Sequence, residues 1–255
     1  SADMRWGETV PQDDRGAAIV LDAEGRFAPI VFAEAALIAA ARAEAAGIGI
    51  VAVTGPGSLG RIAPYARAIA SAGLVGLIAV GSPPLVAPHR GNAAALGTNP
   101  VATGIPTSTT PIVVDASSSL LTKGRWGELR ARGEQVPDGV AIDAAGAVTR
   151  DAELVRAFLS RGGAFGSAMG IVVEMIVNGL TGSLGSSRER RSASVVALRS
   201  LEIDAPLTAV GDDLRARLEA AGGHVPGSNT PDAAGPVSVS TATLQRLAKI
   251  ANTAG

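Results

Sequence analysis

A glycine-rich loop is the first segment of this chain whose spacing suggests chemistry. Gly55-Pro56-Gly57-Ser58-Leu59-Gly60 follows an apolar run and fits the pattern G-x-G-x-x-G. In dinucleotide-binding folds, such a loop brings backbone amides onto a pyrophosphate at the start of a helix. That fold also needs a carboxylate at the end of the next strand, yet here the next apolar run ends Val80-Gly81-Ser82. The spacing alone therefore argues against a Rossmann-type site.

Few side chains in this sequence suit acid–base or metal chemistry. There is no cysteine, which excludes disulfides, thiolate catalysis and Cys-based metal sites, and there are two histidines. His89, in a proline-rich stretch, is either a catalytic or ligand-binding residue or a histidine packed in a loop. His224 follows Gly222-Gly223, and we expect it in a solvated turn. Two isolated histidines without a nearby carboxylate spacing predict no metal site.

Three further polar features stand out by their surroundings. Asp115 ends an apolar run and is either a functional carboxylate or the cap of a helix that begins at Ser117. Glu174 lies inside an apolar helix, where burial requires a hydrogen-bonding partner or a raised pKa, so we interpret it as structural. The run Arg188–Arg191 is interpreted as a solvated loop, with phosphate binding as the alternative.

Composition excludes several classes of protein. Hydrophobic residues make up 47% of the 255 positions and charged residues 18%, which excludes a disordered chain. The net charge of -1 argues against a nucleic-acid-binding protein. No uninterrupted apolar stretch is long enough to span a membrane, and no signal-peptide pattern is visible. We therefore expect a cytoplasmic protein without nucleic-acid or membrane partners.

The elements that must position these residues alternate between short apolar runs and alanine-rich stretches. We expect strands at 17–22, 48–54, 74–80, 111–115 and 195–203, and helices at 32–46, 62–72, 117–132, 167–180, 213–221 and 241–251. Residues 1–182 are expected to form a central cofactor-type domain with active-site loops at 55–60, 81–106 and 162–168. Residues 183–255 are expected to add a strand and helices that complete the same globule.

Three segments resemble a known family in their order and spacing: Ser82–Pro88 (SPPLVAP), Leu96–Pro100 (LGTNP) and Val113–Ser119 (VVDASSS). Together they resemble the malate/L-lactate dehydrogenase family of the second type. This family also includes ureidoglycolate, sulfolactate and 2,3-diketogulonate enzymes and the piperideine/pyrroline-2-carboxylate reductases. The resemblance implies an α/β fold with a mixed, largely antiparallel sheet and flanking helices, which is not a Rossmann fold. It also implies NAD(P)H as cofactor and a homodimer.

The resemblance assigns roles by matched position. The implied cofactor-binding positions are Ser58, Leu59, Gly60, Asp115, Ser117 and Phe165; the catalytic candidates are His89, Thr98 and Asp115; and the substrate-binding candidates are Thr98, Lys123 and Arg125. In relatives the hydroxyl at the position of Thr98 lies near the substrate, a small carboxylated metabolite. Lys123 and Arg125 lie at the family's Arg-Gly-Lys position and either hold an anion or lie on a solvated helix surface.

The sequence departs from the family pattern at several functional positions. The family's Asn-Ser-Asn-His-Phe-Gly is here residues 55–60, with Ser58 in place of histidine. The family's Gly-Gly-His-Lys-Gly-Tyr-Gly is residues 162–168, with Phe165 in place of the lysine expected at the cofactor. His89 and Arg90 stand where relatives usually have an aromatic residue and glycine. The family's N-terminal Ser-His-Gly segment, which implies the general acid and a carboxylate clamp, has no counterpart, so we expect a diverged member that lacks it.

Three functions remain open from the sequence. The losses favour a family member with eroded hydride-transfer machinery, repurposed to isomerisation, cyclisation or elimination on a small carboxylated metabolite. The alternative is a working NAD(P)H-dependent oxidoreductase of a small 2-oxo or cyclic imino acid, with a relocated acid such as His89. The second alternative is a non-catalytic, dimerising partner subunit, and a partner chain is a possible source of the missing N-terminal segment.

Overall fold

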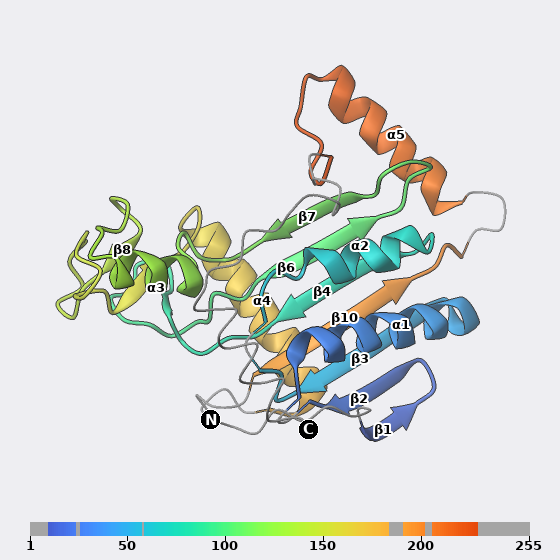
Figure 1. The fold of residues 1–255 in the computed structure, drawn as a ribbon, viewed down its shortest axis with the longest axis horizontal. Coiled ribbons are helices and arrows are strands. Elements are labelled where there is room, and N and C mark those ends of the chain that lie inside the picture. The colour runs from blue at the N-terminus through green and yellow to red at the C-terminus, as the bar shows by residue number, and fades with distance from the viewer. Residues whose placement is uncertain (1–9, 24–25, 58, 184–190, 202–205, 229–255) are drawn as a thin grey trace, which may run out of the picture.

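The computed structural model describes residues 10–23, 26–57, 59–183, 191–201 and 206–228. Its main feature is a seven-stranded sheet in the order β1-β2-β3-β10-β4-β6-β7 (Figure 1). The strands are β1 (Val10–Arg15), β2 (Ala18–Asp22), β3 (Ile48–Thr54), β4 (Val75–Val80), β6 (Val101–Ile105), β7 (Ile112–Ala116) and β10 (Ser192–Leu198).

Strand direction places this sheet outside the Rossmann class. Only β2 and β3 pair in parallel, whereas every other neighbouring pair is antiparallel. The late strand β10 lies between β3 and β4, with Val195 opposite both Val51 and Ile78. The expected α/β fold with a mixed, largely antiparallel sheet is therefore confirmed.

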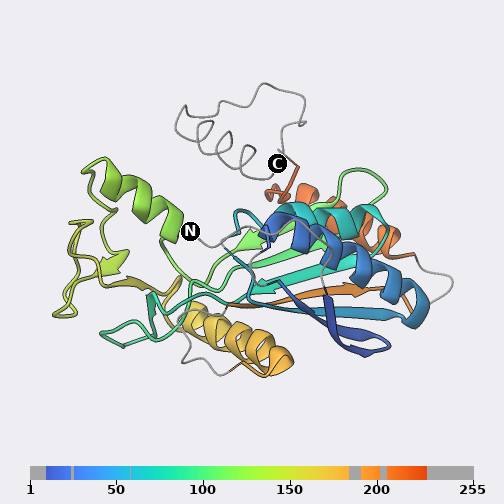
Figure 2. The same ribbon diagram turned by 60° about the horizontal axis from the view of Figure 1, so that its bottom comes forward.

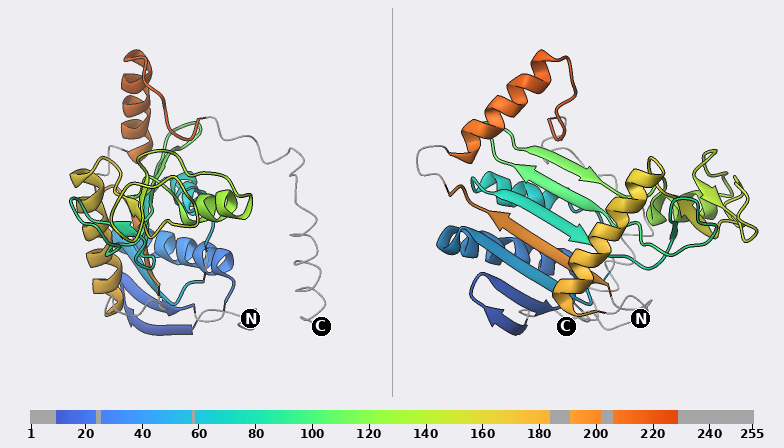
Figure 3. Two further views of the ribbon diagram at one scale, coloured as in Figure 1. Left: turned by 90° about the vertical axis from the view of Figure 1, so that its left-hand side faces the viewer. Right: turned by 180° about the vertical axis from the view of Figure 1, so that it is seen from behind.

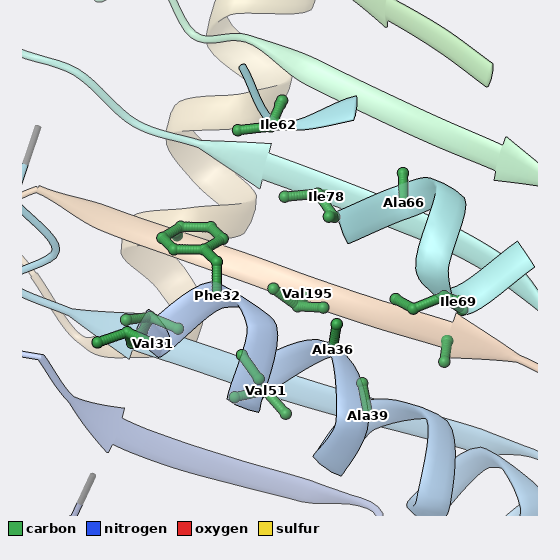
Figure 4. Close-up of a cluster of buried hydrophobic side chains, with 14 of the residues drawn as sticks. Val31, Phe32, Ala36, Ala39, Val51, Ile62, Ala66, Ile69, Ile78 and Val195 are labelled. Carbon is green, nitrogen blue, oxygen red and sulfur yellow. The ribbon is translucent and has the colours of Figure 1, made fainter. Parts of the chain in front are cut away.

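Two helices cover one face of the sheet and enclose the main core. They are α1 (Ala28–Ala46) and α2 (Ala63–Ser71), and both carry alanine where they approach the strands. Phe32, Ile69 and Ile78 are fully buried between these layers, and Figure 4 shows them converging with small side chains. The glycines of the strands permit this close approach, since a Cβ on Gly104 would lie 2.1 Å from the carbonyl oxygen of Ala66.

Among the described residues, the opposite face of the sheet carries one long helix, α4 (Ala164–Thr181). Figure 3 shows α4 crossing the strands and leaving much of that sheet face uncovered, and Figure 2 places it opposite α1 and α2. Val173 and Val177 pack on Ala79 of the sheet. The helix has 18 residues and a mean hydropathy of 1.4, enough by length and composition for a membrane span. Our prediction of no membrane-spanning stretch counted only uninterrupted apolar runs, and Glu174 interrupts this one.

A smaller lobe extends from one edge of the main sheet. It consists of a three-stranded sheet, β5-β9-β8, and helix α3 (Lys123–Ala131). The strands are β5 (Val86–Ala87), β8 (Ala141–Ile142) and β9 (Ala157–Leu159). Its core is separate from the main one and centres on Phe158, against which Trp126 packs edge-on at 5.7 Å between ring centroids. Helix α5 (Leu207–Ala220) lies beyond β7 in Figure 1.

The structure corrects two of the boundaries expected for helices and strands. The helix expected over 117–132 begins only at Lys123, because the hydroxyls of Ser117 and Ser119 bond to nearby backbone and hold an irregular turn. Thr122 then caps α3 by accepting from the Arg125 amide. Strand β10 ends at Leu198 rather than at 203. The helix expected at 241–251 lies outside the described residues.

The close contact at Gly104 yields a stability prediction. Gly104→Ala places a methyl group 2.1 Å from the backbone oxygen of Ala66, which no side-chain rotation relieves. We expect the free energy of unfolding to fall by about 1–3 kcal/mol in chemical denaturation. The control is Gly127→Ala in α3, where the added methyl group meets nothing within 4 Å. That substitution should raise stability by about 0.5–1 kcal/mol, and equal effects of the two changes would contradict the packing described.

Candidate active site

Thr98 lies at a junction of three loops. Its amide donates to Ser82 Oγ at 2.7 Å, and the two hydroxyls lie 3.0 Å apart. Its carbonyl accepts from Ser117 Oγ at 2.7 Å and from Ser118 Oγ at 3.0 Å. The Thr98 loop is thus fastened both to the end of β4 and to the turn after β7.

Glu174 holds the same junction from the side of α4. Its Oε1 accepts from the Gly97 amide and from Asn99 Nδ2, each at 3.1 Å, and its Oε2 accepts from Asn178 Nδ2 at 2.8 Å. Asn99 also donates to the Gly170 carbonyl at 3.0 Å. These donors are the partners that a carboxylate in an apolar helix requires, and they favour the structural interpretation of Glu174.

His89 lies beside the start of α4. Its backbone amide donates to Ser167 Oγ at 3.1 Å. Its ring lies against Gly163, where a Cβ would come within 3.3 Å of Nδ1. The preceding residue is also fixed, because the Ala87 carbonyl accepts from Ser160 Oγ at 2.7 Å. The imidazole is therefore exposed to solvent on a firmly held backbone.

Asp115 does not cap a helix that begins at Ser117, which was one of the two roles expected from the sequence. No helix begins at Ser117; instead the Asp115 carboxylate accepts from the amide of Ala63, the first residue of α2, with Arg61 nearby. Ile62, at the N-cap position of α2, has no capping side chain of its own. Asp115 is an exposed residue, but the protein beside its carboxylate removes part of its water and raises the pKa of Asp115, while the Ala63 amide and Arg61 partly oppose this shift.

The predicted cofactor positions follow a path along the end of the sheet. Leu59 and Gly60 lead into α2, whose first amide meets Asp115. Ser117 follows, and its carbonyl accepts from Arg161 Nε at 3.1 Å, just before Phe165 at the start of α4. Ser58 lies outside the described residues.

The glycine-rich loop leaves room for a ligand. A Cβ on Gly60 would meet nothing within 4 Å, so contacts within the described residues do not explain this glycine. Space beside the loop and the carboxylate of Asp115 fit a nucleotide cofactor. Phe165 is 70% exposed and offers an apolar surface but no charge for phosphate. The residues present therefore fit NAD(P)H in part.

Other predicted residues lie apart from this cluster. Lys123 and Arg125 are exposed on the first turn of α3 in the smaller lobe, and Arg125 pairs with Glu128 at 3.3 Å. Their role in substrate binding stays a prediction. His224 is exposed after α5, as expected for a solvated turn. Within the described ranges, no three His, Asp or Glu side chains are grouped as a metal site would require.

A cavity of about 550 Å³ lies on the α4 side of the junction. Its polar lining includes Ser82, Glu174, Asn178 and Arg191. Burial lowers the pKa of Arg191, which also approaches the glycine-rich loop by donating to the Gly57 carbonyl at 3.5 Å. No spacing in the sequence joins Ser82 to Asn178, because four separate segments, at 81–84, 95, 174–183 and 191–192, line this cavity.

Comparison with known proteins decides the family. The sequence pattern of the malate/L-lactate dehydrogenase family matches residues 7–242. The chain belongs to this family. Family relatives include a malate dehydrogenase of Pyrococcus abyssi, 38% identical over 136 residues, which are 53% of this chain and 38% of that protein. A Delta(1)-pyrroline-2-carboxylate/Delta(1)-piperideine-2-carboxylate reductase of Pseudomonas putida is 34% identical over 182 residues, 69% of this chain and 53% of that protein.

A solved family structure shares the fold over nearly the whole chain. The delta1-piperideine-2-carboxylate reductase of Pseudomonas syringae superposes with a TM-score of 0.82 and 26% sequence identity. That superposition covers 95% of this chain and 80% of the other. In sequence, the chain spans about half the length of the curated relatives it matches, 53% for the Pseudomonas putida reductase.

The shielding of Asp115 yields a pH-dependent prediction. Because its pKa is raised above the ordinary 3.8, ionisation of this carboxyl costs the folded state free energy. The cost is absent below pH 3.8 and complete once the pH exceeds the raised pKa. Asp115→Asn should therefore be more stable than the parent at pH 7, by less than about 1 kcal/mol because solvent screens the group. The difference should vanish near pH 3.5.

The measurement is chemical denaturation at both pH values. Asp138→Asn, which alters an exposed carboxylate in a loop of the smaller lobe, is the matched control and should change stability at neither pH. An Asp115→Asn variant that is less stable at pH 7 would show that ionised Asp115 stabilises the fold.

Proposed function

We propose that this chain is an NAD(P)H-dependent reductase of a small 2-oxo or cyclic imino acid. The observation that carries the proposal is the hydrogen-bonded junction that brings Thr98, Ser117 and Ser82 together next to the path from Gly60 to Phe165. The similarity to dehydrogenases and reductases supports it. We assign the reaction to the cytoplasm.

In this proposal each residue has a separate task. Leu59, Gly60, Asp115 and Ser117 would hold NAD(P)H, which supplies the hydride. The Thr98 hydroxyl, oriented by Ser82, would bind the substrate near its carbonyl or imine. His89 would donate the proton that neutralises the developing alkoxide or amine, since its imidazole is exposed on an anchored backbone beside the start of α4. With the hydride that NAD(P)H would supply and the proton from His89, the product would be the 2-hydroxy or 2-amino acid.

A second candidate is non-redox chemistry on a small carboxylated metabolite. Phe165 favours it, because a side chain that is 70% exposed and apolar stands where the family pattern has its cofactor lysine. In that case the junction would bind the carboxylate, and isomerisation, cyclisation or elimination would proceed without hydride transfer. Such a protein would be a diverged family member.

We further propose a homodimer that forms through α4. Six apolar side chains project from its free surface: Phe165, Ile171, Val172, Met175, Ile176 and Leu180, each at least 38% exposed. The helix that carries this stripe crosses the sheet on the face opposite α1 and α2 (Figure 3), and the six side chains carry no charge. Exposed apolar patches of this kind mark interaction surfaces, and a net charge of only -1 allows two copies to associate. A non-catalytic subunit would use the same face.

Direct titration with NADH and NADPH tests the reductase. We expect a dissociation constant in the micromolar range, followed by cofactor-dependent reduction of a 2-oxo or cyclic imino acid. His89→Ala should leave cofactor binding unchanged and lower kcat by about 10²- to 10⁴-fold, the range for loss of a general acid. His224→Ala, which removes the exposed histidine after α5, is the control and should keep full activity.

Two results would redirect this proposal. The absence of binding at millimolar cofactor would eliminate the reductase and leave the non-redox alternative. Reduction that survives His89→Ala with an unaltered rate and pH profile would keep the reductase but remove His89 as its acid.

Sedimentation velocity tests the dimer. Met175→Glu places a charge in the middle of the α4 stripe, where Met175 is 68% exposed, so we expect the variant to sediment as a monomer. Leu37→Glu is the control, because Leu37 is 74% exposed on α1, on the other side of the sheet. A parent protein that sediments as a monomer would contradict the dimer, and a monomer produced equally by Leu37→Glu would contradict the assigned face.

A further inference from the structure

Arg90 adopts a backbone conformation that arginine seldom takes. Its φ is +64°, in the left-handed region where a Cβ is sterically unfavourable. Among the described residues, Asn99 is the other non-glycine residue in this region, with φ of +41°. Asn99 is held there by its side-chain hydrogen bonds to Gly170 and Glu174, and asparagine tolerates the conformation well. Arg90 needs a different explanation.

No contact within the described part of the chain supplies that explanation. Arg90 is exposed, and its guanidinium makes no hydrogen bond or ion pair with the residues that the structure describes. The strain arises in a tight turn, in which the Gly91 amide donates to the Pro88 carbonyl at 2.8 Å. Glycine would form this turn at lower cost, because it has no Cβ. Arginine at this position therefore lowers the stability of the fold, and no contact among the described residues compensates for the loss.

The turn holds Arg90 rigidly beside the candidate site. The hydrogen bond from the His89 amide to Ser167 Oγ and the one from Ser160 Oγ to the Ala87 carbonyl anchor the backbone just before it. The His89 ring lies against Gly163, two residues before Phe165. The strained residue thus follows directly the histidine to which we assign the proton transfer. Backbone strain that the fold does not need is a mark of functional positions.

We propose that Arg90 binds the anionic group of the ligand, a carboxylate or a phosphate, with His89 beside it. Guanidinium presents two parallel N–H donors that match the oxygens of either group. The helix α4 has an apolar phenylalanine at 165, and Arg161 just before it is bonded to the Ser117 carbonyl, so Arg90 on the adjacent loop adds a cation whose donors bond to no described residue and are free to bind a ligand. This inference rests on the proposed function, because the anion is taken to belong to the substrate or to the cofactor of the proposed reductase.

Arg90→Gly separates binding from folding. Glycine accepts the left-handed conformation, so we expect the variant to fold and its Tm to rise by about 1–4 °C. Its affinities are measured by calorimetry with four probes: oxalate, pyruvate, inorganic pyrophosphate and NADPH. Loss of a charge-assisted hydrogen bond should weaken binding of the responding probes about 10- to 100-fold. Arg217→Ala on the exposed side of α5 is the matched control and should change neither property.

The pattern over the probes identifies the source of the anion. Weaker binding of oxalate and pyruvate alone assigns Arg90 to the substrate carboxylate, and weaker binding of pyrophosphate and NADPH alone assigns it to the cofactor. Affinities within twofold of the parent for every probe would overturn the inference, as would a parent protein that binds no probe, or a Tm that falls in Arg90→Gly.

These outcomes are distinct from failure of the proposed function. A parent protein that binds oxalate through Arg90 but never binds NADPH would refute the reductase and keep the anion site. Normal reduction by Arg90→Gly with parental KM and affinities would keep the reductase and refute the anion site.

Discussion

The carboxylate of Glu174 is the interaction on which the candidate site depends. It accepts hydrogen bonds from Gly97, Asn99 and Asn178, and so joins the Thr98 loop to the inner side of α4. An unpaired carboxylate in this apolar helix would be costly, so the loop has one strongly preferred position. The Thr98 carbonyl then fixes the turn after β7 through Ser117 and Ser118. One charged group thereby organises three segments.

The two faces of the sheet give this site opposite surroundings. On one face, α1 and α2 form a dense core of small side chains, and the start of α2 meets Asp115. On the other face, α4 is the one helix among the described residues (Figure 3). Its apolar stripe toward solvent begins at Phe165, two residues after Gly163, which the His89 ring contacts. A second copy bound along α4 would therefore cover the edge of the site. Association and ligand binding are expected to influence each other for this reason.

Much of the fold was predictable because its signals are local. The apolar runs at 48–54 and 74–80 became β3 and β4, and Gly47 and Gly73 end α1 and α2 in left-handed conformations. The strands β8 and β9 were missed, because two or three residues are too few to show a hydrophobic period. The helix expected from Ser117 failed because serine hydroxyls compete for the backbone there, and helix propensity does not measure that competition.

The sequence by itself determined the family, the alternation of apolar runs that forms the sheet, and the absence of thiol chemistry. It also predicted, from the resemblance, that serine and phenylalanine stand at 58 and 165 in place of a histidine and a lysine. Only the tertiary structure decided that Asp115 meets α2 rather than a helix of its own, that Glu174 is satisfied by residues some 75 positions away, and that Arg90 is strained. Motifs in sequence specify residue types and local spacing, whereas long-range hydrogen bonds, desolvation and left-handed backbone arise only when distant segments pack together.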